Sequence, residues 1–244
     1  MKRYGLIGHP VGHSRSKTFY DSQFAKLGLD CSYHLFDLSP LSFDRDVTDL
    51  LATLDGANVT MPYKVSIMPF LDYIDPVASA IGAVNVIKRV GERWWGFNTD
   101  YVGFGDSFAQ FVGPSIAGGR VLVLGTGGVS RAVQYALRAM GYDFGVVSRG
   151  GGADYVYSDI DERVMGSFGV FVNCTLLGMG AYEGECPLLP YEYLQAAHYL
   201  YDCIYEPART VFLSKGERVG CSVCNGLAMF HSQAENALKI WLTE

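Results

Sequence analysis

A lysine within an otherwise apolar stretch is the first residue of this chain that could do chemistry. Residues 58–64 read NVTMPYK, and they follow the end of an expected helix and the start of a short strand. Asn58, Thr60 and Lys64 are thus polar groups in a segment that otherwise reads as interior. The lysine stem could simply pack on apolar surface while its ammonium group reaches water. Alternatively, the ammonium group is held in a cleft, where it can donate a hydrogen bond and transfer a proton.

Other polar groups follow strand-like segments in the first half of the chain. Ser14 and Ser16, in HSRS, are neighbouring hydroxyl groups that could bind a carboxylate. Asn85, in GAVN, and Asp100, in GFNTD, lie near the two ends of an expected hairpin. Taken singly, such residues more often cap a helix or support a turn. Their roles therefore depend on whether the fold gathers them.

A glycine-rich turn at residues 121–132, VLVLGTGGVSRA, is the strongest local signal. An apolar strand runs into Gly125, Gly127 and Gly128, and a helix follows at once. Glycines let a phosphate approach the backbone, and the helix N-terminus offers unpaired N–H groups. Ser130 occupies the third glycine position of the usual pattern, so the strand–turn–helix context carries the prediction of a dinucleotide site.

The end of the next strand indicates which dinucleotide binds. NAD-binding folds usually place an acidic residue there, where it bonds the ribose hydroxyls. Here the strand ends in Ser148 and Arg149, with no carboxylate. A cation at this point suits the 2′-phosphate of NADP, although a solvated arginine at a strand end is the plain alternative. We therefore expect NADP as the cofactor.

Alternating strand-like and helix-like segments must position these groups. An amphipathic helix is expected over 16–29, with Phe19, Phe24 and Leu27 on one face. Residues 83–98 read as a hairpin that turns at Gly-Glu. The alternation predicts an α/β fold with a mainly parallel sheet in each half.

Composition and charge exclude several classes of function. The formal net charge of -6 argues against a general nucleic-acid binder. No apolar stretch approaches the length that spans a bilayer. The first residues, MKRYGLIGHPVGHS, are broken by Gly, His and Pro and do not resemble a signal peptide, so a cytoplasmic location is expected.

The six cysteines are expected to be free thiols, because no secretion signal is expected. The CSVC segment has zinc-like spacing but lacks a second pair, so no metal site is predicted.

Taken in order, the short motifs resemble those of the shikimate dehydrogenase family. They are GHPVGHSRS, NVTMPYK, GAVN, GFNTD, GTGGVSRA, VNCTLLGM, YDCIYEP and NGLAMFHSQA. The resemblance runs from Gly8 to about Ala234, which is nearly the whole chain. Lys64 and Asp100 stand where that family has its catalytic lysine and aspartate.

The resemblance implies an α/β chain of two domains. Residues 1–101, with a helix at 228–244 that returns to them, would form the substrate-binding catalytic domain. Residues 102–227 would form a Rossmann-type domain that binds NADP. The chain is expected to be a monomer or a homodimer.

The resemblance also implies roles for the residues that match the family's motifs. Catalysis would fall to Lys64 and Asp100. The residues implied to bind the substrate are Ser14, Ser16, Thr60, Asn85, Tyr205 and Gln233. The residues implied to bind the cofactor are Gly125, Gly127, Gly128, Val129, Ser148, Arg149, Cys203, Gly226 and Met229.

The implied reaction is the reversible reduction of 3-dehydroshikimate to shikimate by NADPH, a step toward chorismate and the aromatic amino acids. Lys64 would deliver a proton to the C3 oxygen, and Asp100 would orient a substrate hydroxyl. Two alternatives stay open: a quinate/shikimate dehydrogenase that uses NAD, and a sensor that binds such acids without turnover. Arg149 argues against the first, and the presence of Lys64 and Asp100 argues against the second.

Several positions depart from the family's pattern, among them Asn225 and Ala228, where Asp and Gly are common. The family commonly has Asn-Arg-Thr at the end of the second Rossmann strand, whereas this chain has Ser148-Arg149-Gly150. A hydroxyl group that could hold the 2′-phosphate is thus missing. The following segment is short and lacks the usual amphipathic helix, so a more loosely held adenosine end is expected.

Overall fold

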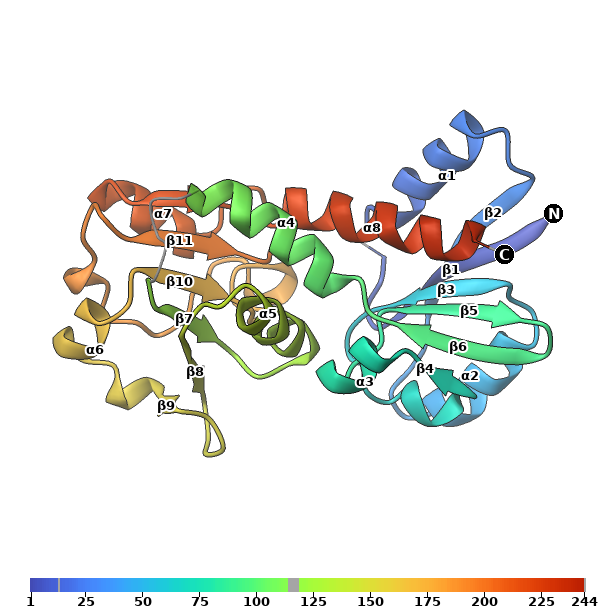
Figure 1. Cartoon of the computed structure of the whole chain (residues 1–244), viewed down its shortest axis with the longest axis horizontal. Helices are drawn as coiled ribbons and strands as arrows, with labels where there is room; N and C mark the ends of the chain where they lie inside the picture. Colours follow the sequence, from blue (N-terminus) through green and yellow to red (C-terminus); the bar gives the residue numbers. More distant parts are fainter. Residues whose placement is uncertain (13, 114–118, 244) are drawn as a thin grey trace. The chain divides into compact units, whose positions relative to one another are not determined.

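The computed structural model describes residues 1–12, 14–113 and 119–243. The chain forms two compact units, each with its own sheet (Figure 1). Unit 1 comprises residues 1–99 and 234–244, and unit 2 comprises residues 100–233. The C-terminal helix α8 (Leu227–Leu242) passes from unit 2 into unit 1 at Ala234.

Unit 1 contains a mixed sheet of six strands in the order β2-β1-β3-β5-β6-β4. The strands are β1 (Lys2–Gly8), β2 (Cys31–Asp37), β3 (Gly56–Val59), β4 (Tyr73–Ile74), β5 (Val86–Val90) and β6 (Arg93–Phe97). β1 pairs in parallel with β2 and β3, whereas β5 runs antiparallel to β3 and β6. The predicted hairpin is confirmed as β5–β6, and it makes this sheet mixed.

The helices of unit 1 bury one face each against the sheet. They are α1 (Ser16–Lys26), α2 (Phe43–Leu51), α3 (Pro76–Ile81) and the end of α8, with a 3-10 turn at Met68–Phe70. In α1 the buried face consists of Ser16, Tyr20 and Phe24. The prediction that Leu27 shares this face was wrong, because Leu27 ends the helix and is 52% exposed.

An aromatic cluster ties the end of α8 to the sheet of unit 1. The Trp241 ring stacks on Tyr4 at 4.7 Å between centroids, and Tyr20 stacks on Tyr33 at 4.5 Å. Trp241 Nε1 donates a hydrogen bond to the Ile87 carbonyl at 3.0 Å. Each of these rings is almost fully buried, so the last helix contributes to the core of unit 1.

Unit 2 contains an all-parallel sheet of six strands in the order β12-β11-β10-β7-β8-β9. The strands are β7 (Val121–Leu124), β8 (Phe144–Ser148), β9 (Tyr155–Val156), β10 (Val170–Asn173), β11 (Tyr199–Asp202) and β12 (Ser222–Cys224). The helices are α4 (Asp100–Val112), α5 (Gly128–Ala139), α6 (Glu162–Gly166), α7 (Val211–Val219) and the start of α8. β7, β10 and most of β8 and β11 are buried, as expected for strands covered on both faces.

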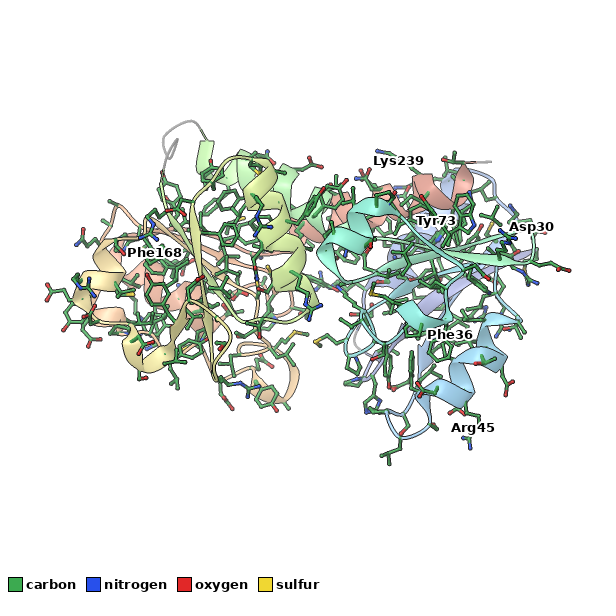
Figure 2. The ribbon with its side chains drawn as sticks, turned by 60° about the horizontal axis from the view of Figure 1, so that its bottom comes forward. Asp30, Phe36, Arg45, Tyr73, Phe168 and Lys239 are labelled. Atoms are coloured by element: carbon green, nitrogen blue, oxygen red, sulfur yellow. The ribbon has the colours of Figure 1, made fainter. Side chains whose placement is uncertain are left out.

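The connection from β8 to β10 is short. It holds β9, a 3-10 turn at Tyr157–Asp159 and the five-residue helix α6, so no long amphipathic helix lies between these strands. Phe168 follows α6, and its ring is 2% exposed within unit 2 (Figure 2). Gly145 of β8 leaves room for that ring, because a β-carbon there would lie 3.0 Å from it.

In the part of the chain that the structure describes, no helix is long and apolar enough to cross a membrane. The same part contains no group of three or more His, Cys, Asp or Glu side chains that could hold a metal ion. All six cysteines are free thiols, as predicted.

Candidate active site

The two predicted serines lie together in unit 1, where the chain leaves β1 and enters α1. Ser14 Oγ donates a hydrogen bond to Ser16 Oγ at 3.0 Å, and the Ser16 amide donates to Ser14 Oγ at 3.2 Å. Ser16 is the first residue of α1, so its neighbourhood carries the unpaired N–H groups of a helix N-terminus. Hydroxyl groups and N–H groups at one point suit the binding of a carboxylate.

Thr60 and Lys64 lie in the turn that follows β3. The Thr60 amide donates to the Ile7 carbonyl of β1 at 2.9 Å, which extends the parallel pairing by one residue. The Lys64 carbonyl accepts a bond from the Val84 amide at 2.7 Å, and the Lys64 side chain is partly buried. Packing also holds the turn in place, because the buried Tyr63 ring stacks on the Phe43 ring with 3.9 Å between the ring centroids. The backbone that carries Lys64 is therefore fixed on both sides.

Asn85 joins the end of β3 to the end of β6. Its carbonyl accepts from the Val59 amide at 2.8 Å, and its side-chain Oδ1 accepts from the Thr99 amide at 2.7 Å. Asn85 Nδ2 also donates to Thr99 Oγ1 at 3.1 Å, and Asn85 is 3% exposed. This residue thus positions Thr99, and Asp100 follows Thr99 as the first residue of α4.

The structure adds Asn58 to this set, a polar residue to which the sequence assigned no role. Asn58 lies in β3 and is 6% exposed, and its Oδ1 accepts a bond from Tyr33 Oη at 2.7 Å. Among the residues that the structure describes, Asn58 Nδ2 has no well-formed hydrogen bond, although Asn58 lies close enough to the Tyr20 hydroxyl to lower its pKa against the larger, raising effect of burial. An unsatisfied buried donor is costly and often marks a ligand site. A polar residue in an otherwise buried strand is the sequence signal that could have identified it.

The glycine-rich turn of unit 2 has the geometry that a phosphate requires. Gly125 adopts a φ of +105°, and a β-carbon there would lie 3.2 Å from Thr175, so only glycine fits without strain. Gly127 caps α5 and Gly128 begins it, with open space around Gly127. Val129 lies in the same first turn of α5 and is partly buried. The unpaired N–H groups of this turn can receive a pyrophosphate.

Ser130 explains why the third glycine of the pattern can be replaced. Its side chain is fully buried, and its Oγ donates to the Gly125 carbonyl at 2.6 Å. Gln134, one turn further along α5, donates to the same Oγ at 3.0 Å. The hydroxyl group therefore braces the turn from inside and does not face a ligand.

At the end of β8, Ser148 is buried and its neighbour Arg149 is exposed. Ser148 is 8% exposed, and its hydroxyl forms hydrogen bonds with the backbone of Gly150 in the same loop. Tyr157 lies close enough for the Arg149 charge to lower its pKa, although burial has the larger effect and raises that pKa to about 12. Tyr157 Oη has no hydrogen-bond partner within the described residues and is buried.

The remaining predicted residues of unit 2 lie around the loops after β11 and β12. Gly226 packs directly on Cys203, because a β-carbon at Gly226 would lie 2.2 Å from the Cys203 carbonyl oxygen. Gly103 of α4 packs in the same way on Met229 and Gln233 of α8, since a β-carbon at Gly103 would lie 2.6 Å from the Met229 carbonyl oxygen. The Tyr205 ring lies 4.8 Å from the Phe230 ring, also on α8.

A buried carboxylate holds the loop that carries Cys203 and Tyr205. Asp202 ends β11 with no exposed surface, and it accepts bonds from Thr210 Oγ1 at 2.7 Å and from the Ile204 amide at 3.0 Å. Asn173 Nδ2 donates a third bond at 3.1 Å. Burial nevertheless raises the pKa of Asp202 from 3.8 to about 6, since these bonds only partly offset desolvation.

Asp202→Asn should therefore flatten the dependence of stability on pH. The folded protein binds this proton more tightly than the unfolded chain does, so the wild-type free energy of unfolding should fall as pH rises from about 4 to about 6. A tenfold difference in proton affinity corresponds to about 1.4 kcal/mol. Urea unfolding over a pH series measures the effect, with the exposed Asp143→Asn as the matched control. A wild-type slope that the asparagine variant retains would contradict this assignment.

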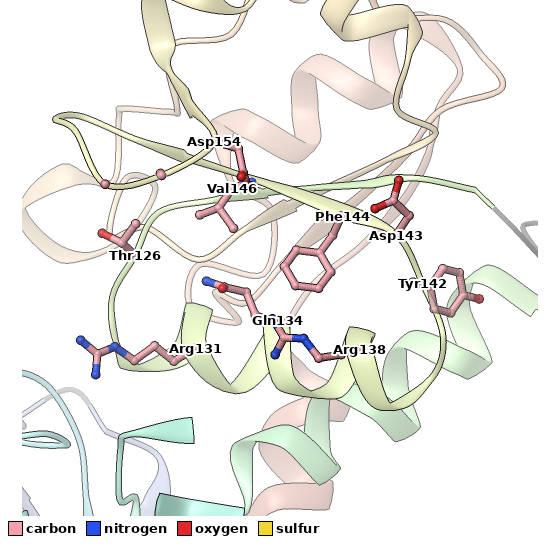
Figure 3. A pocket seen from close by; sticks show the side chains of 11 residues that line it. Thr126, Arg131, Gln134, Arg138, Tyr142, Asp143, Phe144, Val146 and Asp154 are labelled. Atoms are coloured by element: carbon pink, nitrogen blue, oxygen red, sulfur yellow. The ribbon is translucent and has the colours of Figure 1, made fainter. Parts of the chain in front are cut away.

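A pocket of about 890 Å³ lies beside α5 in unit 2 (Figure 3). Arg131, Gln134 and Arg138 line it from α5, while Phe144 and Val146 line it from β8. Thr126 and Arg131 lie at one end of it, and Tyr142 and Asp143 lie at the other (Figure 3). None of the predicted site residues lines this pocket. Gly152, Ala153 and Asp154, in the connection after β8, complete its lining.

Of the residues predicted to act on or bind the substrate, Ser14, Ser16, Thr60, Lys64 and Asn85 belong to unit 1, where Ser14 and Ser16 share a hydrogen bond. Asp100, Tyr205, Gln233 and all the cofactor residues belong to unit 2. Asp100 and Gln233, which the sequence reading placed in the substrate-binding domain, lie in unit 2 by this division.

Comparison with known proteins identifies the family. Residues 6–87 match the family model described as the shikimate dehydrogenase substrate binding domain. The NADP(+) shikimate dehydrogenase of Shouchella clausii is 33% identical over 255 residues, which cover 98% of this chain and 92% of that protein.

Solved structures agree with this match over the whole chain. Shikimate dehydrogenase from Aquifex aeolicus has a TM-score of 0.89 at 32% identity, with 99% of this chain and 92% of that chain covered. The Thermus thermophilus enzyme, solved in complex with NADP(H) and shikimate, has a TM-score of 0.87 at 31% identity, with 99% and 94% covered. The chain therefore belongs to the shikimate dehydrogenase family.

Proposed function

We propose that this chain is an NADP-dependent shikimate dehydrogenase, an oxidoreductase that interconverts 3-dehydroshikimate and shikimate. The observation that carries this proposal is the full-length match to NADP(+) shikimate dehydrogenases. The chain also retains the lysine, the aspartate and the glycine turn that the chemistry needs. The reaction belongs to the shikimate pathway toward chorismate and the aromatic amino acids.

The residues of unit 2 fit a bound NADP. The turn at Gly125–Gly128 presents helix N–H groups to a pyrophosphate, and exposed Arg149 offers a cation to a 2′-phosphate. Cys203, Gly226 and Met229 would lie toward the nicotinamide. When bound, the cofactor supplies the hydride chemistry.

In the proposed mechanism, side chains of the protein transfer the proton and orient the substrate. The Lys64 ammonium group donates a hydrogen bond to the C3 oxygen of the substrate and transfers a proton to it in the reductive direction. Asp100 accepts a hydrogen bond from a substrate hydroxyl and so orients the ring. A cation next to the oxygen that gains negative charge also stabilises the transition state.

The other residues orient the substrate. We assign its carboxylate to Ser14, Ser16 and Tyr205, since the two serines already lie within a hydrogen bond of each other. We assign the ring hydroxyls to Thr60, Asn85 and Gln233. The unsatisfied Nδ2 of Asn58 supplies a further donor for a substrate oxygen, which would complete its hydrogen bonding.

We also propose that the protein acts in the cytoplasm, as a monomer or a homodimer. Six free thiols suit a reducing compartment.

The test is the absorbance of the reduced nicotinamide during shikimate oxidation by the purified protein. NADP and NAD are compared side by side, and quinate is then offered in place of shikimate. Turnover of shikimate with NADP is the expected result. Comparable rates with NAD or quinate would instead indicate the broader dehydrogenase, and tight shikimate binding without turnover would indicate a sensor.

A further inference from the structure

Two thiols meet at the carboxyl edge of the parallel sheet in unit 2. Cys174 directly follows β10, Cys203 directly follows β11, and their Sγ atoms are 3.8 Å apart. The Cys203 amide donates to the Asn173 carbonyl at 3.0 Å, so the pairing of the two strands continues to this point. Neighbouring strands therefore hold the two cysteines side by side.

The local environment of the two thiols determines their exposure and the pKa of Cys203. Both residues expose part of their surface, although the Cys203 sulfur itself is affected by burial. The pKa of the Cys203 thiol lies well above its usual value, first because it shares a hydrogen bond with Cys174 and then because it is buried. A thiol with a raised pKa forms the reactive thiolate less readily, so we assign the attack on the oxidant to the other sulfur of the pair.

The pair also touches both turns that we assign to the cofactor. A β-carbon at Gly226 would lie 2.2 Å from the Cys203 carbonyl oxygen, and one at Gly125 would lie 3.4 Å from the Cys174 carbonyl oxygen. A displacement of either cysteine is therefore transmitted to the glycine turn or to the start of α8.

We propose that Cys174 and Cys203 form a reversible disulfide when the protein meets a hydroperoxide, and that this disulfide weakens cofactor binding. The Cys174 sulfur attacks the peroxide, which gives a sulfenic acid and releases water or an alcohol. The Cys203 sulfur then displaces the sulfenic oxygen, which leaves as water with the Cys203 proton. Two thiols are oxidised to one disulfide, and the peroxide bond is reduced.

Geometry explains why cofactor binding should suffer. A disulfide requires the sulfurs to approach to about 2 Å, so the present 3.8 Å separation must shrink. The strand ends and the two glycine turns packed on them must shift with it. The effect on the cofactor rests on the proposed function, whereas the formation of the disulfide does not.

Neither a metal nor another cysteine competes strongly for these thiols. Cys221 donates to the Gln195 carbonyl at 3.2 Å, and Cys224 donates to the Asn225 carbonyl at 3.4 Å. In the described ranges no third metal-binding side chain joins the pair, which disfavours a metal site.

The experiment treats the whole protein with hydrogen peroxide and maps its thiols. Two of the six thiols should disappear, the mass should fall by two hydrogen atoms, and dithiothreitol should reverse both changes. Cleavage after glutamate, at Glu183, Glu185 and Glu192, places Cys174, Cys186 and Cys203 in separate peptides. A peptide that joins Cys174 to Cys203 supports the proposal. A different pairing, or sulfinic acid without any disulfide, overturns it.

The effect on the cofactor is measured by titration of NADPH into reduced and oxidised protein. We expect binding to weaken by about tenfold, since displacements near 1 Å in such sites have effects of this size or larger. Cys174→Ser should abolish the response relative to its own untreated state, and Cys31→Ser, a thiol in unit 1, should preserve it. A disulfide that leaves NADPH affinity unchanged would contradict the proposed link. Shikimate oxidation by the untreated protein tests the proposed function separately.

Discussion

Lys64→Ala should lower kcat for shikimate oxidation by about 10²- to 10⁴-fold, which is the usual contribution of a positioned acid–base group. The change in KM should be smaller, because the other polar groups of unit 1 remain to bind the substrate. Loss of the ammonium group removes both the proton donor and the cation beside the reacting oxygen. Steady-state kinetics with NADP at saturation measure both parameters.

The variant should fold normally, which keeps the result interpretable. The turn is held by backbone bonds at Lys64 and by Tyr63, whose Oη donates to the Leu38 carbonyl at 2.5 Å. Neither contact involves the lysine side chain. Lys26→Ala, an exposed lysine at the end of α1, is the matched control and should retain wild-type kcat. Wild-type kcat in Lys64→Ala would exclude Lys64 as the proton donor.

Lys64→Arg separates the two roles of this side chain. Arginine keeps the positive charge but holds its proton too tightly to transfer it. A large loss of kcat in both variants would assign the effect to proton transfer. Substantial recovery in the arginine variant would assign it to charge alone, and the proposed acid–base role would then be wrong.

The sequence predicted the strongest local features of the fold because each rests on short-range chemistry. The glycine turn before α5 and the hairpin β5–β6 are specified by residues that adopt conformations other residues avoid, or by a regular strand pattern. The family resemblance added the order of the motifs, which no local rule supplies. Together they gave the fold class, the enzyme class and NADP, which the comparisons support.

Long-range contacts set the limit of such prediction. Leu27 has helical spacing with Phe24, yet the helix ends there and the side chain is exposed. The role of Asn58 depends on Tyr33, which satisfies one end of its amide and leaves the other unsatisfied. The sequence alone does not show which partner a buried amide finds across a sheet.

The same limit applies to Ser148. Its contact with the cofactor stays a prediction, and the structure adds that its hydroxyl bonds the Gly150 backbone. The three glycines that follow let the chain fold back onto that hydroxyl, and this local bond was not evident from the motif. Arg149 is exposed and is the cation predicted to recognise the 2′-phosphate.

Arg149→Ala should weaken NADP(H) binding far more than NAD(H) binding. A hydrogen bond to a charged group contributes about 1.5–3 kcal/mol, which is roughly 10- to 100-fold in Kd. NAD has no 2′-phosphate, so its Kd should hardly change. Titration of both reduced cofactors, followed by nicotinamide fluorescence, measures the difference without any need for turnover.

The matched control for this prediction is Arg163→Ala, which removes an exposed arginine from α6 of the same unit. It should leave the preference for NADPH unchanged. Adenosine 2′,5′-bisphosphate and 5′-AMP provide a second comparison, because they differ only in the phosphate that Arg149 is proposed to bind. If Arg149→Ala weakened both nucleotides equally, the arginine would act on the loop and not on the 2′-phosphate. Cofactor choice would then have to come from other groups near the end of β8.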